Sequence, residues 1–342
     1  MAAARAKAVV IMAAGLGTRM KSQKAKVLHP VAGRPMIHYP VRDALSLGAD
    51  RVVVIVGHQR EQVEGYLAEA FPGAPVTGAL QAEQLGTAHA VLCAEQALAD
   101  FEGDVFILSG DVPTLGLSML QKLDEIAGEA PVALITMRLD DPAAYGRIVR
   151  DAEGQVVAIT EARDCTPAQL EIDEVNAGIY RVEARFLFDT LKNLGNDNAQ
   201  GEFYLTDVVA RAVETGRAVA AMVLEGAEAE EAEGVNNRAD LARAEGRMQR
   251  HIKDGLLTAG VAMPLPETNW IHDGVQVGPD TVIEPGACLT GNTRVGQSCH
   301  VGQGARLHDV VLADGARVGA GAVVSSLEIE ADHEVPPLTL LD

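Results

Sequence analysis

Over the first two thirds of the chain, hydrophobic positions form short continuous apolar runs that alternate with amphipathic stretches. The apolar runs have the composition of strands buried on both faces, as at Arg51–Val56, Asp104–Ser109 and Val132–Arg138. The stretches between and before them predict helices at residues 34–48, 59–71 and 87–101. This alternation, which extends to about residue 225, predicts an α/β domain in which crossover helices connect parallel strands.

The hydrophobic rhythm changes after residue 263. Small apolar residues then recur every six positions, with one five-residue step, at Val277, Ile283, Leu289, Val295, Val301, Leu307, Leu312, Val318 and Val324. Such a rhythm predicts the hexapeptide repeat of a parallel β-helix, in which each hexad forms one short strand and one corner. At three hexads per coil we expect about three coils. The rhythm fades after Val324, and we expect Pro336 and Pro337 to end strand pairing there.

An amphipathic segment connects these two patterns. Between residues 238 and 262, one helical face carries Leu241, Met248, Ile252 and Leu256, which predicts a linking helix. We therefore predict a domain at residues 1–237, the linking helix at 238–262 and a short β-helix at 263–342. A chain of 342 residues is too long for one ordinary core, and this favours the division.

Composition restricts the partners and the location of the protein. The formal net charge of −20 disfavours nucleic acid and anionic membranes as partners. No apolar stretch approaches the ~20 residues that cross a bilayer. The amino terminus runs into the first strand and leaves no room for a signal peptide, so we expect a cytoplasmic protein. The cysteines lack metal-ligand spacing and are expected to be reduced thiols.

One basic stretch interrupts this acidic chain directly after the first apolar run. Gly15 and Gly17 allow the backbone to turn and to approach a ligand closely, and Arg19 and Lys26 follow among several basic residues. The pattern predicts phosphate binding, with a strand-to-helix turn and a solvated basic flank as the alternative. It matches neither the P-loop nor the dinucleotide-binding motif.

A carboxylate, Asp111, stands just beyond the apolar run Asp104–Ser109. Ligands of parallel sheets bind beyond the carboxyl ends of the strands, where both Asp111 and the glycine turn are expected to lie. Mg²⁺ prefers one or two protein oxygens together with substrate phosphates and water. Asp111 is therefore a candidate magnesium ligand, although an aspartate at this position can also cap a turn.

Six motifs occur in the order found in the sugar-1-phosphate nucleotidyltransferases. They are MAAGLGTRM with AKVLHP, QAEQLGTAHA, GDVP, YGRIVR, NAQGEFYLTD and EGVNNR. Together they resemble the bacterial N-acetylglucosamine-1-phosphate uridyltransferases of the GlmU type over almost the whole chain. The resemblance implies a Rossmann-like nucleotide-diphospho-sugar transferase domain followed by a short left-handed parallel β-helix. The chain departs from the family pattern at Ala25, Ser109 and Ala177.

The same resemblance implies a reaction and its site. Uridylyl is transferred from UTP to N-acetylglucosamine-1-phosphate, which gives pyrophosphate and UDP-N-acetylglucosamine, a precursor for peptidoglycan. The implied catalytic residues are Arg19 and Lys26. The implied nucleotide-binding residues are Ala14, Gly15, Gly17, Gln81, Gly86 and Thr87, and Gly146, Glu161 and Asn176 would bind the sugar. Mg²⁺ would be held by Asp111 and Asn236, with Asn237 open as an alternative to Asn236.

Other readings of the chain stay open at this point. Ser109 and Ala177 leave room for another sugar-1-phosphate or another base, whereas intact Arg19, Lys26 and Asp111 argue against a catalytically silent assembly protein. A truncated form of a bifunctional acetyltransferase and uridyltransferase is a further alternative. We expect a homotrimer formed through the repeats and no acetyltransferase activity, because the acetyl site of the longer relatives draws on further coils.

Overall fold

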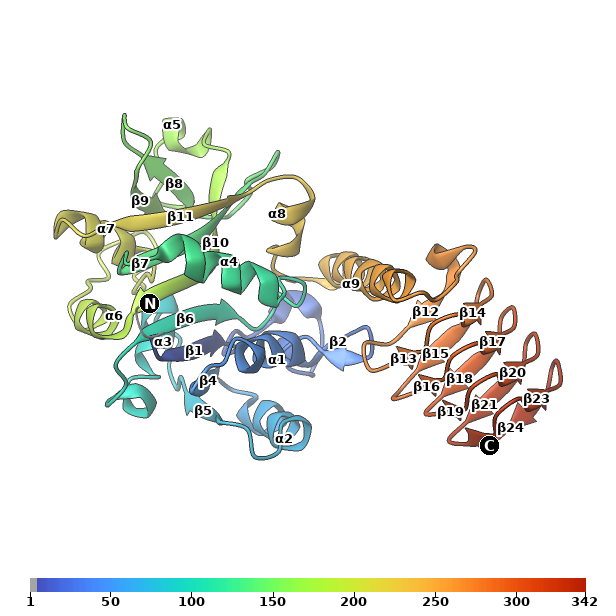
Figure 1. Ribbon diagram of the computed structural model, residues 1–342. Helices are drawn as coiled ribbons and strands as arrows, with labels where there is room; N and C mark the ends of the chain where they lie inside the picture. Colours follow the sequence, from blue (N-terminus) through green and yellow to red (C-terminus); the bar gives the residue numbers. More distant parts are fainter. Residues whose placement is uncertain (1–4) are drawn as a thin grey trace. The chain divides into compact units, whose positions relative to one another are not determined.

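The computed structural model describes residues 5–342 and divides into two compact units (Figure 1). Unit 1 contains the described residues up to His29 together with Met36–Arg238. Unit 2 contains Pro30–Pro35 and Ala239–Asp342.

Unit 1 is built on a mixed sheet of nine strands. The strand order is β11-β7-β10-β6-β1-β4-β5, and β8 pairs with both β10 and β9. All neighbours along this order are parallel except β10, which runs antiparallel between β6 and β7. The strands are β1 (Lys7–Met12), β4 (Arg51–Val56), β5 (Val76–Leu80), β6 (Asp104–Ser109), β7 (Val132–Arg138), β8 (Arg147–Arg150), β9 (Val156–Thr160), β10 (Glu174–Glu183) and β11 (Val219–Leu224).

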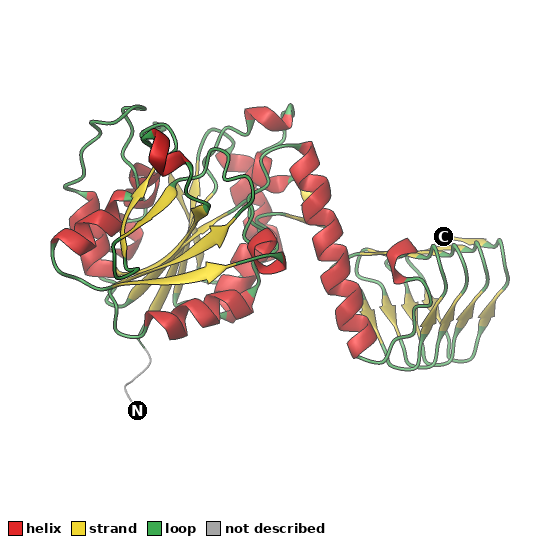
Figure 2. Cartoon of the chain, turned by 90° about the horizontal axis from the view of Figure 1, so that it is seen from above, coloured by secondary structure: helices red, strands yellow, loops and turns green. Residues whose placement is uncertain are grey.

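Helices cover both faces of this sheet, as Figure 2 shows. Successive residues of a strand point to opposite faces, so Val9 and Ile11 of β1 share a core with α1, α2 and α4, while Ala8 and Val10 share another with α3, α6 and α7. The helices are α1 (His38–Ser46), α2 (Arg60–Ala70), α3 (Thr87–Leu92), α4 (Leu117–Ala127), α5 (Pro167–Leu170), α6 (Ala184–Leu191), α7 (Asp207–Glu214) and α8 (Ala227–Glu231). Short 3₁₀ turns lie at Thr18–Met20, Lys26–Leu28 and Gln96–Leu98.

The predicted α/β class is confirmed, and β4, β6 and β7 have the predicted bounds. Helix α2 begins and ends one residue inside its predicted bounds, and two other helices are much shorter than predicted. Helix α1 begins at His38, because Arg34–Pro35 (β3) pairs with Pro30–Val31 (β2) in a hairpin. Helix α3 ends at Leu92 and is followed by a separate 3₁₀ turn rather than continuing to residue 101.

Unit 2 consists mainly of a stack of short parallel strands, as predicted for a left-handed β-helix (Figure 1). The strands form three sheets, with orders β12-β15-β18-β21-β24, β13-β16-β19-β22 and β14-β17-β20-β23. Their bounds are β12 (Trp270–Ile271), β13 (Gln276–Val277), β14 (Val282–Ile283), β15 (Cys288–Thr290), β16 (Arg294–Val295), β17 (His300–Val301), β18 (Arg306–His308), β19 (Val311–Leu312), β20 (Arg317–Val318), β21 (Val323–Ser325), β22 (Glu328–Ile329), β23 (Glu334–Val335) and β24 (Leu340–Leu341).

The β-helix is longer than predicted. It has four complete coils and the first strand of a fifth, because the repeat begins one strand earlier than predicted, at Trp270–Ile271, and continues past Val324. Ile329 and Val335 are buried in the same core as the predicted hexad positions. The expectation that Pro336 and Pro337 end the pairing is wrong, because both lie in the corner between β23 and β24, and β24 pairs with β21.

The predicted linking helix is α9 (Arg238–Thr258), whose residues Ile252 and Leu256 pack against the core of the β-helix. The hairpin of β2 and β3 belongs to the same unit, where the Ala32 amide donates to Glu245 Oε2 at 2.7 Å. Within residues 5–342, the structure contains no helix with the length and apolar character needed to cross a membrane.

Candidate active site

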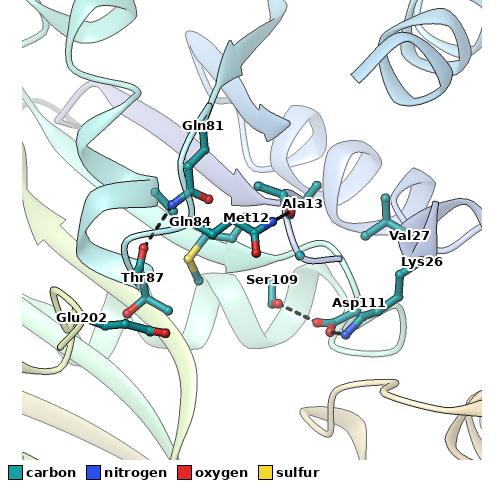
Figure 3. Close-up of a pocket in the computed structure, with 14 residues that line it drawn as sticks. Met12, Ala13, Lys26, Val27, Gln81, Gln84, Thr87, Ser109, Asp111 and Glu202 are labelled. Atoms are coloured by element: carbon teal, nitrogen blue, oxygen red, sulfur yellow. Dashed lines mark hydrogen bonds and ion pairs between the residues drawn. The ribbon is translucent and has the colours of Figure 1, made fainter. Parts of the chain in front are cut away.

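A cavity of about 310 Å³ opens at the carboxyl ends of the central strands of unit 1. It is lined by the turn after β1, the 3₁₀ turn at Lys26–Leu28, the segment after β5 and the end of β6. Figure 3 shows Lys26, Asp111 and Ser109 at one end of it and Gln81, Thr87 and Glu202 at the other. The predicted residues among its lining are Ala14, Gly15, Lys26, Gln81, Gly86, Thr87 and Asp111.

Lys26 is the centre of a cluster of polar side chains at one end of the cavity, which also includes Asp111, Asn236, Arg19 and Ser109. The Lys26 ammonium forms an ion pair with Asp111 Oδ2 and donates to Asn236 Oδ1 at 3.1 Å. Arg19 Nη2 donates to the same amide oxygen at 3.0 Å. Ser109 Oγ donates to Asp111 Oδ1 at 2.5 Å. The structure therefore brings together both predicted cations and both predicted metal ligands, although Arg19 and Asn236 do not line the cavity itself.

Backbone geometry positions these side chains. Gly17 has a φ of 60°, and a Cβ atom at this position would lie 2.7 Å from Lys26 Cβ, so the absence of a side chain lets the Lys26 stem pack against the turn. On the other side, the Val235 amide donates to the Asp111 carbonyl at 2.9 Å. The adjacent Asn236 Nδ2 donates to the Gly234 carbonyl at 3.2 Å, which directs its amide oxygen towards the two cations.

The donor set of Asp111 and Asn236 fits a hard divalent cation. One carboxylate and one amide carbonyl supply hard oxygens, and hydrogen bonds hold both in place. No group of three or more histidine, cysteine, aspartate or glutamate side chains within residues 5–342 could hold a metal ion. A cation at this pair would complete its coordination with water and substrate phosphates, as Mg²⁺ prefers.

The other end of the cavity contains the buried amide of Gln81. Its Nε2 donates to the Gly86 carbonyl at 3.2 Å and lies 3.2 Å from His89 Nδ1. The amide nitrogen is thereby committed to the protein, and the carbonyl oxygen is the group that can accept from a base. Nearby, Gln84 Nε2 donates to the Ala14 carbonyl at 2.7 Å and connects this segment to the glycine turn.

Residues 198–206, the bridging segment, pack against the segment that carries Gln81. The backbone amide of Phe203 donates to the Leu85 carbonyl at 2.8 Å, and the Phe203 carbonyl accepts from the Ala88 amide at 2.9 Å. Thr87 Oγ1 accepts from the Leu205 amide at 3.0 Å. Gly86 is the N-cap of α3, and the Thr87 hydroxyl bonds to the bridging segment.

The three predicted sugar-binding residues form a separate group near β8, β9 and β10. The backbone amide of Asn176 donates to the Gly146 carbonyl at 2.9 Å. A Cβ atom at Gly146 would lie 3.5 Å from Glu161 Oε2. Thr206 Oγ donates to Glu161 Oε1 at 3.1 Å. Burial raises the pKa of the Glu161 carboxyl, and the Thr206 hydrogen bond opposes that shift. None of the three is among the described residues that line the cavity, but the bridging segment connects them to it.

Comparison with known proteins identifies the family. The model of the nucleotidyl transferase family matches residues 8–263. The bifunctional protein GlmU of Anaeromyxobacter sp. (strain Fw109-5) is 48% identical over 334 residues, which are 98% of this chain and 68% of that protein. The bifunctional protein GlmU of Pelobacter propionicus is 46% identical over 337 residues, which are 98% of this chain and 72% of that protein. The chain belongs to the GlmU-type nucleotidyltransferases.

Family membership confirms what the ordered motifs predicted and establishes the class of activity. The chain is a nucleotidyltransferase that acts on small-molecule substrates, and proteins of this type generally use a divalent metal. The cavity at the strand ends of unit 1 lies within the matched residues.

Four side chains at or near the cavity were missed by sequence reasoning: Gln84, Ser109, Glu202 and Thr206. All four lie in or beside the quoted motifs, so the motifs marked the right segments. Residue type alone did not show which members of a motif face the cavity. Ser109 was noted only as a departure from the family pattern, whereas its hydroxyl holds Asp111.

Proposed function

We propose that unit 1 transfers uridylyl from UTP to N-acetylglucosamine-1-phosphate, giving UDP-N-acetylglucosamine and pyrophosphate. One observation carries this proposal. Lys26 and Asp111 line one end of the cavity, where Asn236 and Arg19 join them through hydrogen bonds from just outside its lining, and the Gln81 amide lines the other end. A nucleoside triphosphate has this distribution of chemistry, with a polyanion at one end and a base at the other. Unit 1 contains every residue proposed here for the reaction, all of which lie within the predicted domain at residues 1–237.

The nucleophile of this reaction needs no general base. A phosphate monoester is already largely dianionic near neutral pH, because its second pKa is about 6. An oxygen of the sugar phosphate forms a bond to the α-phosphorus of UTP, and the bond from that phosphorus to the bridging oxygen of pyrophosphate breaks. Pyrophosphate leaves with the electron pair. The protein must therefore align two anions and neutralise charge rather than move a proton.

Lys26 and Arg19 are the cations placed for that task. Both reach the cluster at the strand ends, and both have donors that can bind phosphate oxygens as the negative charge moves from the α-phosphorus to the leaving group. Asp111 and Asn236 would hold Mg²⁺, with Asn236 preferred over Asn237 because it contacts both Lys26 and Arg19. When bound, the metal adds positive charge at the phosphates.

The geometry of Gln81 supports recognition of uracil. With its nitrogen held by Gly86, the Gln81 carbonyl can accept from the N3–H of uracil, whereas N3 of cytosine has no proton to donate. Ala14, Gly15 and Gly86 also line the cavity, and the two glycines, which have no side chain, let a nucleotide approach their backbone closely. Glu161 and Asn176 would bind the hydroxyl and acetamido groups of the sugar. Gly146, directly before β8, accepts from the Asn176 backbone amide, lies beside Glu161 and would contact the sugar with its backbone.

The proposal is tested by measuring pyrophosphate release with a panel of substrates. UTP, CTP, dTTP and GTP are each combined with the 1-phosphates of N-acetylglucosamine, glucosamine and glucose in the presence of Mg²⁺. We expect UTP with N-acetylglucosamine-1-phosphate to give the highest kcat/KM. A higher value for any other pair would contradict the substrate assignment, and absence of release without added sugar phosphate is the control for UTP hydrolysis.

We also propose that the chain assembles as a homotrimer through unit 2. In the sheet formed by β12, β15, β18, β21 and β24, the outward row includes Trp270 and Leu340, which are 46% and 68% exposed. Cyclic packing of three copies would cover such a row on each copy without leaving an open contact. The expected cytoplasmic location and the expected lack of acetyltransferase activity stay predictions.

A further inference from the structure

The side-chain oxygens of Asp111 and Asn236, which are proposed to hold the metal, both bond to the ammonium of Lys26. Lys26 Nζ lies between them, in an ion pair with Asp111 Oδ2 and 3.1 Å from Asn236 Oδ1. We propose that Lys26 is a resident cation that blocks metal binding to the free protein, and that the metal enters when a nucleotide phosphate takes over the Lys26 ammonium. The inference rests on the proposed function, because it takes Asp111 and Asn236 as the metal ligands.

Charge at the cluster supports this block. Among Arg19, Ser109, Asp111 and Asn236, the four side chains around Lys26, Asp111 is the only carboxylate. Lys26 pairs with it directly, and Arg19 is held nearby because it donates to the same Asn236 oxygen as Lys26. The Lys26 and Asp111 side chains are each only 15% exposed, so water screens their surroundings weakly. A divalent ion that entered while Lys26 stayed in place would be repelled by the ammonium and would have to share both of its oxygens with it.

Lys26 is also built so that its head group can move while its stem stays fixed. The Cβ atom packs against Gly17, which anchors the beginning of the side chain at the turn. The ammonium is at the end of a flexible four-carbon stem, and it can bond to a phosphate oxygen as well as to a carboxylate. Since Lys26 also lines the cavity, a triphosphate there offers it a new partner at the moment that Asp111 and Asn236 become available to the metal.

The consequence is a coupling between metal and nucleotide that is carried by one side chain. If nucleotide binding removes the competitor of the metal, then each of the two ligands strengthens the binding of the other by the same factor. Removing the ammonium by mutation should have the same effect on metal binding as the nucleotide has. A variant without the Lys26 charge is therefore expected to bind metal in the absence of any nucleotide.

The test measures Mn²⁺ binding to the free full-length chain by the loss of the free Mn²⁺ signal in electron paramagnetic resonance. We expect Lys26→Gln to bind Mn²⁺ at least ~10-fold more tightly than the wild type, because a competing positive charge is removed. Lys26→Met is measured beside it, and circular dichroism checks the folding of both. Lys24→Gln is the matched control, since it removes the same charge from an exposed position two residues away.

The site itself is checked with the double variant Lys26→Gln/Asp111→Asn, in which the tighter binding should disappear. If neither Lys26 variant binds Mn²⁺ more tightly than the wild type, or if Lys24→Gln shows the same gain, the inference is wrong. It is also wrong if the gain persists without the Asp111 carboxylate. These outcomes do not depend on substrate identity. Failure of the substrate panel with an intact Mn²⁺ result would overturn the proposed function alone.

Discussion

The Asp111 carboxylate holds the basic cluster of the cavity together. The carboxylate pairs with Lys26 and accepts from Ser109, and the backbone carbonyl of Asp111 accepts from the Val235 amide. One residue therefore connects the end of β6 to two distant segments. We expect Asp111→Asn to lower kcat at least ~100-fold, because the variant keeps the shape of the side chain but loses the charge that is proposed to hold the metal in the transition state. Steady-state kinetics with UTP and saturating Mg²⁺ measures this.

The control for that variant is Asp189→Asn, which removes an exposed carboxylate in α6. Its kcat should equal that of the wild type. Full turnover of a folded Asp111→Asn protein would show that this carboxylate takes no part in the reaction, and would remove Asp111 from the proposed site.

The hydrogen bond from Thr206 to Glu161 leads to a prediction about pH. Burial raises the pKa of Glu161, so this carboxyl is protonated at a higher pH than an exposed glutamate. Its proposed role of accepting from sugar hydroxyls should be lost as pH falls through that pKa. The Thr206 hydroxyl stabilises the ionised form. Thr206→Val should therefore shift the loss of sugar binding to higher pH.

This prediction is measured as KM for N-acetylglucosamine-1-phosphate in wild type and variant from about pH 5 to pH 8. The sugar phosphate also titrates in this range, but equally for both proteins, so the difference between the two curves isolates Glu161. KM for UTP should change little. Identical curves for the two proteins would mean that Glu161 does not contact the sugar.

Sequence reasoning found these chemistry-bearing residues where strand ends or special backbone positions marked them. Asp111 follows an apolar strand and Gly17 stands in a turn, so both could be predicted from local pattern. Thr206 and Glu202 could not, because they reach the site through packing of the bridging segment against residues far away in the sequence. Lys26 was predicted to bind phosphate. Only the three-dimensional contacts show that its ammonium also bonds to the two oxygens proposed to hold the metal.

Among the elements of the fold, the bridging segment depends on one glycine. Gly86 has a φ of 110°, and a Cβ atom there would lie 2.5 Å from the Phe203 carbonyl oxygen. Gly86→Ala should push the bridging segment away from α3 and displace both Gln81 and Thr206. We therefore expect KM to rise for both substrates in this variant, whereas a defect confined to the nucleotide site would change KM for UTP alone.

Gly73→Ala is the control for backbone strain. Gly73 also has a positive φ, of 75°, but no atom lies within 4 Å of the position of an added Cβ. Its KM values should match the wild type even though its stability falls. Unchanged KM values in Gly86→Ala would show that the contact with Phe203 does not position either substrate site.

Element prediction succeeded where a single period described the whole segment. Strands β4, β6 and β7 are continuous apolar runs, and the hexads form strands as expected. Strand β10 was missed because Asn176 and Gly178 interrupt its pattern, and the structure has an irregularity in the pairing between Asn176 and Ile179. The prediction that Pro336 and Pro337 end the strand pairing is wrong, because a missing N–H removes no strand pairing when it lies in a corner.

The stacked core of the β-helix gives a prediction about stability. Leu307 of β18 is buried between Leu289 and Val324 of the neighbouring coils. Leu307→Ala should lower the free energy of unfolding by about 2–5 kcal/mol, through lost burial and a cavity that neighbouring strands cannot fill. Urea unfolding followed by tryptophan fluorescence reports on this unit, because Trp270, the one tryptophan of the chain, lies in β12.

Val311→Ala is the matched control for Leu307. Val311 lies in β19 and its side chain is exposed, so its truncation should change the unfolding free energy by no more than ~0.5 kcal/mol. An equally small effect of Leu307→Ala would mean that the repeats do not form a continuous buried core.

The molecule as a whole combines an acidic chain with local positive charge at one cavity. The formal net charge of −20 repels other polyanions over most of the surface, while Lys26 and Arg19 gather where a triphosphate is proposed to bind. The same charge makes copies of the chain repel one another. Any assembly of identical chains must overcome this repulsion with apolar contacts, and salt should weaken the repulsion.

The proposed homotrimer can be tested on these grounds. Sedimentation equilibrium of the wild type should give the mass of three chains, and a higher fraction of trimer at higher salt. Trp270→Asp should shift the equilibrium towards single chains, because it places a charge in the outward row that includes Leu340. Val311→Asp puts the same charge on the sheet of β13, β16, β19 and β22 and should leave the mass unchanged. A mass of one chain for the wild type contradicts the trimer, and dissociation by Val311→Asp alone would exclude the Trp270 face as the interface.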